Sequence, residues 1–230
     1  MRNSVLRITG AMALVILGIW AGAKIHSSHN RMQGQRAMAV PAGEASPPNL
    51  SDLPPLQEGF LPPAKVPQQL PSFSLANRAG KSTSIGSFAG KSLIINFWAT
   101  WCAPCRSEIP LLEHLHAEWS NRDVSVVGIA VDHRDAVLAF ADHLKISYPL
   151  LIGEEDALSA AAAFGVESPV FPFTVFTDHR GEVVALFVGE LHTQQAELIL
   201  SQVQAINDNR LRLPDAQRAI AAGLEALKAS

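Results

Sequence analysis

Cys102 and Cys105 are the only two cysteines in the chain, and Ala103 and Pro104 separate them. The apolar run Ser92–Trp98 lies just before them and favours a buried strand, whereas the residues from Ala103 onward favour a helix. A cysteine at a helix amino terminus lies where unpaired N–H groups and the helix dipole stabilise a thiolate. The second cysteine follows one turn later and can close a small disulfide ring. The pair therefore predicts a redox-active dithiol.

Other uses of a close cysteine pair are possible. A structural zinc site needs about four ligands, but the histidines are scattered, and His114 and His116 fall on different faces of the predicted helix. A c-type haem site needs a histidine directly after the second cysteine, where this chain has Arg106. A purely structural disulfide is a further alternative, although so small a loop stabilises little by entropy. We expect no metal and no cofactor other than the disulfide itself.

The surrounding pattern predicts the elements that position this pair. Strands are expected over Ser92–Trp98 and Val124–Val131, and over Phe173–Thr177 and Val183–Val188, which form a hairpin around a turn ending at Gly181. Helices are expected over Ala103–Trp119, Asp135–Leu144, Glu154–Phe164 and Thr193–Asn207, the last with Thr193 as its amino-terminal cap. Strands and helices alternate first and a hairpin follows, which predicts an α/β fold with helices on both faces of a central sheet.

Composition divides the chain into four predicted parts. With 48% hydrophobic residues and a net charge of −3, the 230-residue chain contains a folded core and is not a nucleic-acid binder. Residues 1–24 hold a short apolar stretch behind two arginines and predict a signal peptide or, as we favour, a signal anchor. Residues 25–71 hold nine of the 15 prolines and predict a semi-rigid linker. Residues 72–207 form the folded domain, and residues 208–230 a helical extension.

The amino-terminal stretch has a consequence for location. A signal peptide and a signal anchor both export the residues that follow, so we expect the domain on the periplasmic or extracytoplasmic side of a bacterial inner membrane. The stretch itself would contact the membrane if it is retained.

The residues Asn96–Pro110 (NFWATWCAPCRSEIP) resemble the thioredoxin fold. More narrowly, they resemble the exported TlpA/ResA-type thiol–disulfide oxidoreductases, which include the thioredoxins of cytochrome c maturation. The likeness extends over roughly residues 73–204. It implies a thioredoxin-like three-layer fold, with a central mixed sheet between helices, and thiol–disulfide exchange as the activity.

The same resemblance implies a substrate-binding role for three residues. Pro172 would be a cis-proline that faces the disulfide, Phe171 would offer backbone groups to a substrate chain, and Trp101 would contact the substrate. The alternative for Pro172 is a trans proline that starts a strand. Pro169 and the bulky Phe171 depart from the commonest family pattern, so the shape of the substrate groove is open.

Glu108 is the third expected catalytic residue. It follows Cys105 by one helical turn and matches the acid of TlpA/ResA-type proteins. A partly buried carboxyl there, with a raised pKa, could accept and return a proton. Thioredoxins carry an aspartate where Asn96 stands, and an asparagine cannot ionise. The alternative for Glu108 is a solvated acid that complements the helix dipole.

Together these residues predict a disulfide reductase. Cys102 would attack a protein disulfide and Cys105 would resolve the mixed disulfide. Ala103 and Pro104 bring no charge, and Glu108 would oppose a thiolate, so the couple should be reducing. The resemblance implies a membrane thiol reductase as the electron donor, and apocytochrome c or a cupric-oxidase assembly protein as substrate. A thiol peroxidase and a non-catalytic binding or metal-chaperone module are the alternatives.

Overall fold

The structure is a computed structural model that describes residues 59–60, 66–166 and 170–229 of the chain. The predicted signal segment and most of the predicted linker lie outside the described residues. Within the described ranges, no helix is both long and apolar enough to cross a membrane.

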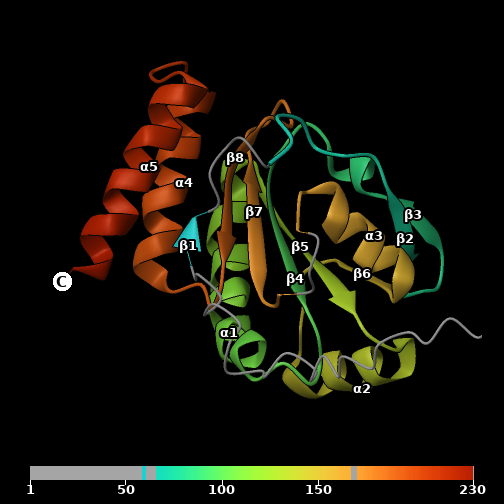
Figure 1. Cartoon of the computed structure of the whole chain (residues 1–230). Coiled ribbons are helices and arrows are strands. Elements are labelled where there is room, and N and C mark those ends of the chain that lie inside the picture. The colour runs from blue at the N-terminus through green and yellow to red at the C-terminus, as the bar shows by residue number, and fades with distance from the viewer. Residues whose placement is uncertain (1–58, 61–65, 167–169, 230) are drawn as a thin grey trace, which may run out of the picture. The chain divides into compact units, whose positions relative to one another are not determined.

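A mixed sheet forms the centre of the molecule (Figure 1). Its strand order is β1-β8-β7-β4-β5-β6-β2-β3. β4, β5 and β6 run parallel to one another, and every other neighbouring pair is antiparallel. The strands are β1 (Gly59–Phe60), β2 (Ser74–Asn77), β3 (Ser82–Ser84), β4 (Ser92–Trp98), β5 (Val124–Val131), β6 (Leu150–Gly153), β7 (Phe173–Thr177) and β8 (Val183–Val188).

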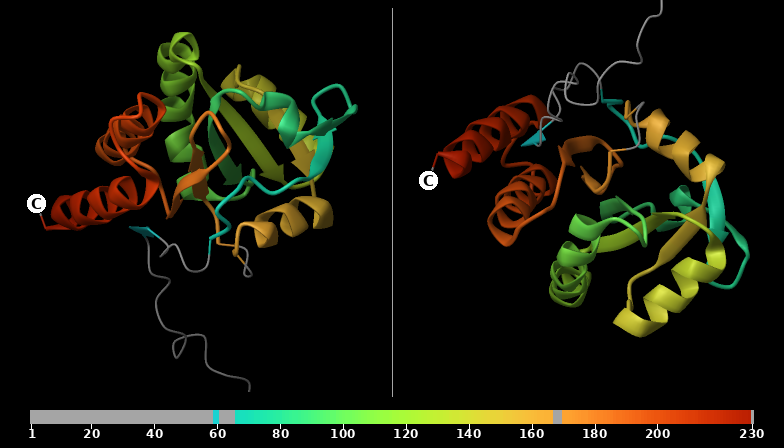
Figure 2. Two further views of the ribbon diagram at one scale, coloured as in Figure 1. Left: turned by 90° about the horizontal axis from the view of Figure 1, so that it is seen from above. Right: turned by 60° about the horizontal axis from the view of Figure 1, so that its bottom comes forward.

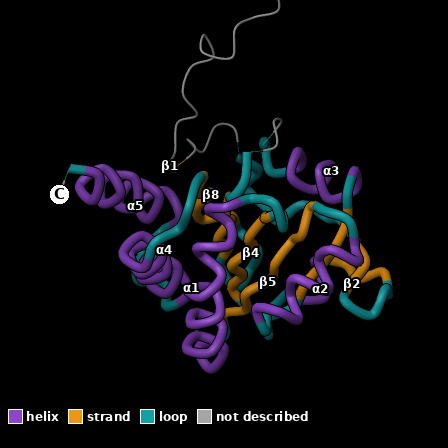
Figure 3. The backbone as a smooth tube through the Cα atoms, turned by 90° about the horizontal axis from the view of Figure 1, so that it is seen from below, coloured by secondary structure: helices purple, strands orange, loops and turns teal. Residues whose placement is uncertain are grey.

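Within the part of the chain that the structure describes, five α-helices pack around the sheet. They are α1 (Ala103–Trp119), α2 (Arg134–Leu144), α3 (Glu155–Ala163), α4 (Thr193–Asn207) and α5 (Leu213–Lys228). Figures 2 and 3 show α1, α2 and α4 on one face of the sheet and α3 on the opposite face. This arrangement confirms the predicted α/β fold with helices on both faces.

The pleat of the strands explains the two layers of core. Every residue of β4 is buried, and successive side chains point to opposite faces of the sheet. Ile94 and Trp98 therefore pack with α1, α2 and α4, whereas Ile95 and Phe97 pack with α3. Burial on both faces accounts for the continuous apolar sequence of this strand.

The central strands and helices match their predicted bounds closely, whereas the peripheral ones do not. β4, β5, β7, β8, α1 and α4 have the predicted ends. The short strands β1, β2, β3 and β6 were not predicted. Thr193 is the first residue of α4 and not its amino-terminal cap. The cap is His192, whose N–H donates to Gln195 Oε1 at 2.8 Å.

The predicted carboxy-terminal helix is present as α5. It lies against α4 on the side away from the sheet centre (Figures 1 and 3). Its Ala216, Ile220 and Leu224 are buried in the same core cluster as α1 and α4. The prediction that residues 208–230 form an extension separate from the domain of residues 72–207 stays a prediction.

Candidate active site

The cysteine pair lies where β4 ends and α1 begins. Cys102 caps the helix, and its sulfur accepts a hydrogen bond from the N–H of Cys105 at 3.3 Å. The two sulfurs form a disulfide with an S–S distance of 2.00 Å and a Cα–Cα distance of 5.3 Å. Cys102 is 5% exposed and Cys105 is 0% exposed. Cys102 is thus the sulfur nearer to solvent, as a first attacking thiol requires.

Glu108 lies in the buried interior behind the disulfide. It is 1% exposed, and each carboxylate oxygen accepts one hydrogen bond. Asn96 Nδ2 donates to Oε1 at 2.7 Å, and the N–H of Leu191 donates to Oε2 at 2.9 Å. Asn96 Nδ2 also donates to Thr174 Oγ1 at 3.0 Å. Residues from β4, β7 and the segment before α4 therefore hold this carboxyl in one orientation.

The surroundings of Glu108 change its acidity. The pKa of the carboxyl rises from 4.5 to about 7, mainly because of burial and to a smaller extent because of the negative charge of Glu190. The hydrogen bonds from Leu191 and Asn96 lower the pKa and offset part of the burial effect. A group that titrates near neutral pH can take up and release a proton under ordinary conditions. The solvated position considered as an alternative for Glu108 is not found.

Trp101 and Phe171, two of the three expected substrate-binding residues, lie side by side, and Pro172 directly follows Phe171. The Phe171–Pro172 peptide bond is cis. Trp101 is 67% exposed, and its ring meets the ring of Phe171 edge-on at a centroid distance of 6.2 Å. Trp98, in contrast, is completely buried. Of these two tryptophans only Trp101 is accessible to a bound chain, and Trp98 lies in the core cluster that also contains Cys102 and Cys105.

A hollow of about 380 Å³ opens beside Trp101, and we call it the Trp101 groove. Its apolar lining consists of Trp101, Val131, Leu158 and Phe171. Its polar lining consists of Asp132, His133, Glu154 and Glu155. The groove is thus lined by apolar and acidic residues together with one histidine.

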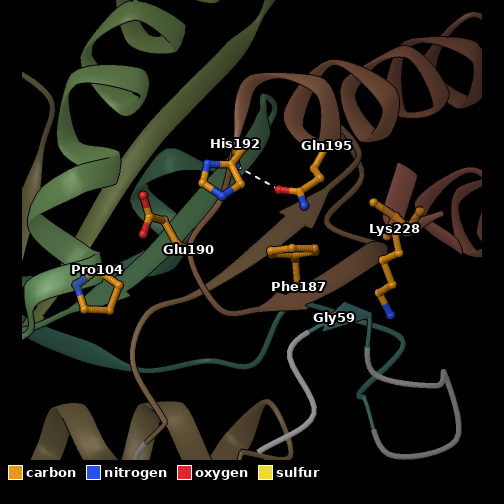
Figure 4. Close-up of a pocket in the computed structure, with 8 residues that line it drawn as sticks. Gly59, Pro104, Phe187, Glu190, His192, Gln195 and Lys228 are labelled. Atoms are coloured by element: carbon orange, nitrogen blue, oxygen red, sulfur yellow. Dashed lines mark hydrogen bonds between the residues drawn. The ribbon is translucent and has the colours of Figure 1, made fainter. Parts of the chain in front are cut away.

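A second hollow of about 220 Å³ reaches Pro104 of the cysteine motif (Figure 4). Glu190, His192 and Gln195 line it from the start of α4, and Leu224 and Lys228 line it from α5. In Figure 4 the Glu190 carboxylate lies on the side of Pro104, and Lys228 lies on the opposite side. This hollow is smaller and more polar than the Trp101 groove.

Sequence reasoning missed the partners of Glu108. Leu191 is 83 positions away and contributes only a backbone N–H, which leaves no trace in the residue type. Thr174, which binds Asn96, is 78 positions from it in the strand β7. A threonine within this largely apolar strand was the available signal, although the same strand also contains Thr177. Among the described residues, no group of three or more His, Cys, Asp or Glu side chains is placed to hold a metal ion.

Comparisons with known proteins cover this same part of the chain. The AhpC/TSA family profile matches residues 66–187. The thioredoxin-like protein YneN of Bacillus subtilis is 35% identical over 134 residues, which are 56% of this chain and 75% of that protein. The thiol-disulfide oxidoreductase ResA of Halalkalibacterium halodurans is 27% identical over 142 residues, which are 61% of this chain and 78% of that protein. A secreted thiol-disulfide isomerase from Corynebacterium glutamicum superposes with a TM-score of 0.54 at 25% identity, covering 74% of this chain and 95% of that one.

Proposed function

This chain belongs to the AhpC/TSA family and is a thioredoxin-fold thiol–disulfide oxidoreductase, and on that premise we propose that it reduces disulfides in exported proteins. The observation that carries the proposal is the disulfide at the start of α1 with a buried carboxyl, of pKa about 7, one helical turn beyond it. Such a site can exchange two electrons and manage the accompanying protons without another cofactor.

The reaction proceeds in two exchanges. The Cys102 thiolate attacks one sulfur of the substrate disulfide, a mixed disulfide forms, and the first substrate thiolate leaves. The Cys105 thiolate then attacks the Cys102 sulfur, the Cys102–Cys105 bond forms, and the second substrate thiolate leaves. The substrate gains two electrons and the cysteine pair loses two. A dithiol donor returns the pair to its reduced form by the same steps in reverse.

Glu108 handles the proton of Cys105 in this scheme. Cys105 is completely buried and has no direct access to water. A carboxylate on the same helix face can accept the thiol proton as the thiolate forms, and can return it when the pair is reduced again. Pro172 and Phe171 position the substrate chain opposite Cys102.

The electrostatics of the site favour reduction over oxidation. Strong oxidants stabilise the reduced thiolate, which makes their disulfide easy to reduce. Here no charged residue separates the cysteines, and Arg106, the nearest cation in sequence, is exposed. An ionised Glu108 would oppose a nearby thiolate. We expect a potential nearer to about −270 mV, as in thioredoxin, than to about −120 mV, as in DsbA.

Location and partners follow from the sequence and the relatives. The apolar amino-terminal stretch supports export, as a secreted protein or one anchored to the outer side of the inner membrane, and the C. glutamicum relative is described as secreted. Because an exported reductase works in an oxidising space, its electrons come from a membrane thiol reductase. Apocytochrome c, whose haem-site cysteines must be reduced, is the substrate we propose first.

Trapping tests this function directly. The Cys105→Ala variant retains the attacking thiol and lacks the resolving one, so mixed disulfides with substrates should accumulate in the native membrane. The Cys102→Ala variant is the matched control and should capture none. If the Cys105→Ala protein captures nothing while Cys102 is still alkylated freely, the exchange scheme is wrong.

Two further measurements separate the alternatives. A potential above roughly −180 mV, the value of protein disulfide isomerase, would overturn the reducing assignment. A non-catalytic module would show no dithiol-dependent reduction of insulin, and a thiol peroxidase would consume peroxide with the Cys102–Cys105 pair as its electron source.

A further inference from the structure

The side-chain amide of Asn96 joins the buried carboxyl to the neighbouring strand β7. Asn96 is buried, and its Nδ2 donates two hydrogen bonds. One goes to Glu108 Oε1 at 2.7 Å and the other to Thr174 Oγ1 at 3.0 Å. Asn96 and Thr174 lie directly opposite each other in the antiparallel pairing of β4 and β7. The register of the sheet therefore sets the contact between these two side chains.

The oxygen of the same amide is left without a partner. Asn96 Oδ1 is buried and accepts no hydrogen bond from the described residues. An unpaired buried acceptor costs free energy, so its presence calls for a reason. If the amide turned over, Oδ1 would face the hydroxyl of Thr174 but also Glu108 Oε1, and two acceptors repel each other unless the carboxyl carries a proton. The observed orientation of the amide therefore favours the ionised form of Glu108.

This preference acts against the other influences on the carboxyl. Burial raises the pKa of Glu108, the hydrogen bonds from Leu191 and Asn96 lower it, and the charge of Glu190 raises it. Tyr148 also interacts with this carboxyl through charge, but burial raises the pKa of the Tyr148 hydroxyl well above its usual value, so this group stays neutral. An asparagine cannot ionise, so Asn96 favours the charged carboxyl without competing for its proton.

We propose that Asn96 and Thr174 are positioning residues for the proposed reaction. Thr174 fixes the amide of Asn96 in the orientation that favours an ionised Glu108. The carboxylate then accepts the proton of the Cys105 thiol, the Cys105 thiolate attacks the Cys102 sulfur, and the substrate thiolate leaves as the internal disulfide forms. The inference rests on the proposed function and adds two residues that act through Glu108.

Dithionitrobenzoate separates the two exchanges in time. With one equivalent of this small disulfide, attack by Cys102 of the reduced full chain releases one coloured thionitrobenzoate, and attack by Cys105 then releases the second. The Cys105→Ala variant should release only the first. In the wild type the rate of the second release should rise with pH through the pKa of Glu108, because the ionised carboxylate is the base. Glu108→Gln should lose this rise near neutral pH.

Variants of the two positioning residues should move the midpoint of this rise. Asn96→Leu removes a hydrogen bond to the ionised carboxyl and should raise the midpoint by about one pH unit. Thr174→Val frees the amide to turn over and should raise it by less, whereas Thr174→Ser keeps a hydroxyl and should restore the wild-type value. Thr177→Val is the matched control, since Thr177 is an equally buried threonine of β7 whose hydroxyl accepts instead from the N–H of Leu93 at 3.1 Å. This control should leave the midpoint unchanged.

Nuclear magnetic resonance tests the same contact without a substitution at either residue. In the oxidised wild-type chain, the side-chain nitrogen signal of Asn96 should shift with pH, with its midpoint at the pKa of Glu108, about 7. Glu108→Gln should abolish this shift. A signal that does not change between pH 5 and pH 9 would overturn the proposal, even if Asn96→Leu does not fold.

The kinetic outcomes distinguish the proposed function from the positioning role. If the reduced wild-type chain releases no thionitrobenzoate, or if its second release has the same pH dependence as in Glu108→Gln, the proposed function itself fails. If the second release depends on Glu108 while Asn96→Leu and Thr174→Val keep the midpoint of Thr177→Val, the function stands and the positioning role is wrong.

Discussion

At the scale of single residues, Glu108 connects the stability of the fold to its chemistry. A carboxyl that is 1% exposed is costly to ionise, and the two hydrogen bonds it accepts offset only part of this cost. Its pKa is about 7 in the folded protein and close to 4.5 when the chain is unfolded. The folded state therefore binds this proton more tightly than the unfolded state.

This difference predicts a pH dependence of stability. The stabilisation from the bound proton is complete below pH 4.5 and is lost as the pH rises through about 7. At about 1.4 kcal/mol per pKa unit, the loss amounts to about 3 kcal/mol. In Glu108→Gln, which cannot ionise, the free energy of unfolding should lose this dependence between pH 5 and pH 8. Urea unfolding of the oxidised protein across this range measures it.

Glu190→Gln provides the control for this prediction. The variant keeps the buried carboxyl and removes the nearby charge that raises its pKa. Its stability should still begin to fall near pH 4.5, but the fall should end at a lower pH and be smaller than in the wild type. Parallel curves for the wild type and Glu108→Gln would mean that Glu108 does not titrate in this range.

The sequence predicts the residues of this site better than their contacts. The spacing of Cys102, Cys105 and Glu108 follows from one helix, so their shared face was foreseeable. The N–H of Leu191 reaches Glu108 only because β8 returns beside β7 and the chain then turns toward α1. Such a contact depends on the tertiary fold and on a backbone atom, and no residue type encodes it. The catalytic and substrate-binding roles of these residues stay predictions.

At the scale of elements, Gly128 allows two aromatic rings and a leucine side chain to approach the backbone of β5 closely. A Cβ atom on Gly128 in β5 would lie 2.9 Å from Tyr148 Cε2, 3.1 Å from Trp98 Nε1 and 2.6 Å from Leu150 Cδ2. Trp98 and Tyr148 are both completely buried. Because Gly128 has no side chain, β4, β5 and α1 can pack closely together.

Gly128→Ala should therefore destabilise the fold through overpacking. We expect a loss of about 1–3 kcal/mol in the free energy of unfolding, because rigid buried rings must shift to admit the methyl group. Gly86→Ala is the control, since the nearest atom to its added Cβ is Ser84 Oγ at 3.4 Å. Guanidinium unfolding of both variants measures the difference. Equal stability of the two would show that the core under α1 has room to adapt.

Strands that are buried on both faces were predicted from the sequence, whereas more exposed strands were not. β4, β5, β7 and β8 are buried on both faces, so each appears in the sequence as an apolar run with clear ends. β3 (STS) has no buried residue and β2 (SLAN) has only one, Leu75. β3 is an edge strand and β2 lies next to it, and the backbone hydrogen bonds that hold them to the sheet leave no hydrophobic pattern in the sequence. The pattern of the central elements nevertheless predicted the α/β fold correctly, and the resemblance of residues 96–110 correctly implied its thioredoxin-like form.

At the scale of the whole molecule, α5 lies beyond residues 66–187, where the family profile matches. Its sequence indicated a helix, but a helix pattern alone does not say what the helix packs against. Ile220 is completely buried within the core cluster that includes α1 and α4, and Leu224 and Lys228 line the hollow next to Pro104. These contacts argue that α5 unfolds together with the rest of the domain.

Ile220→Ala tests this cooperativity. If α5 belongs to the same folding unit, removal of the buried side-chain atoms should lower the global free energy of unfolding by about 2–5 kcal/mol, with one transition seen by both circular dichroism and tryptophan fluorescence. Ala222→Ser, at an exposed position of the same helix, should change it little. The rate with dithionitrobenzoate should stay unchanged, because Ile220 is outside the cysteine site. An early loss of helical signal in Ile220→Ala, with an unchanged fluorescence transition, would instead make α5 an independent appendage, since the tryptophans all lie outside it.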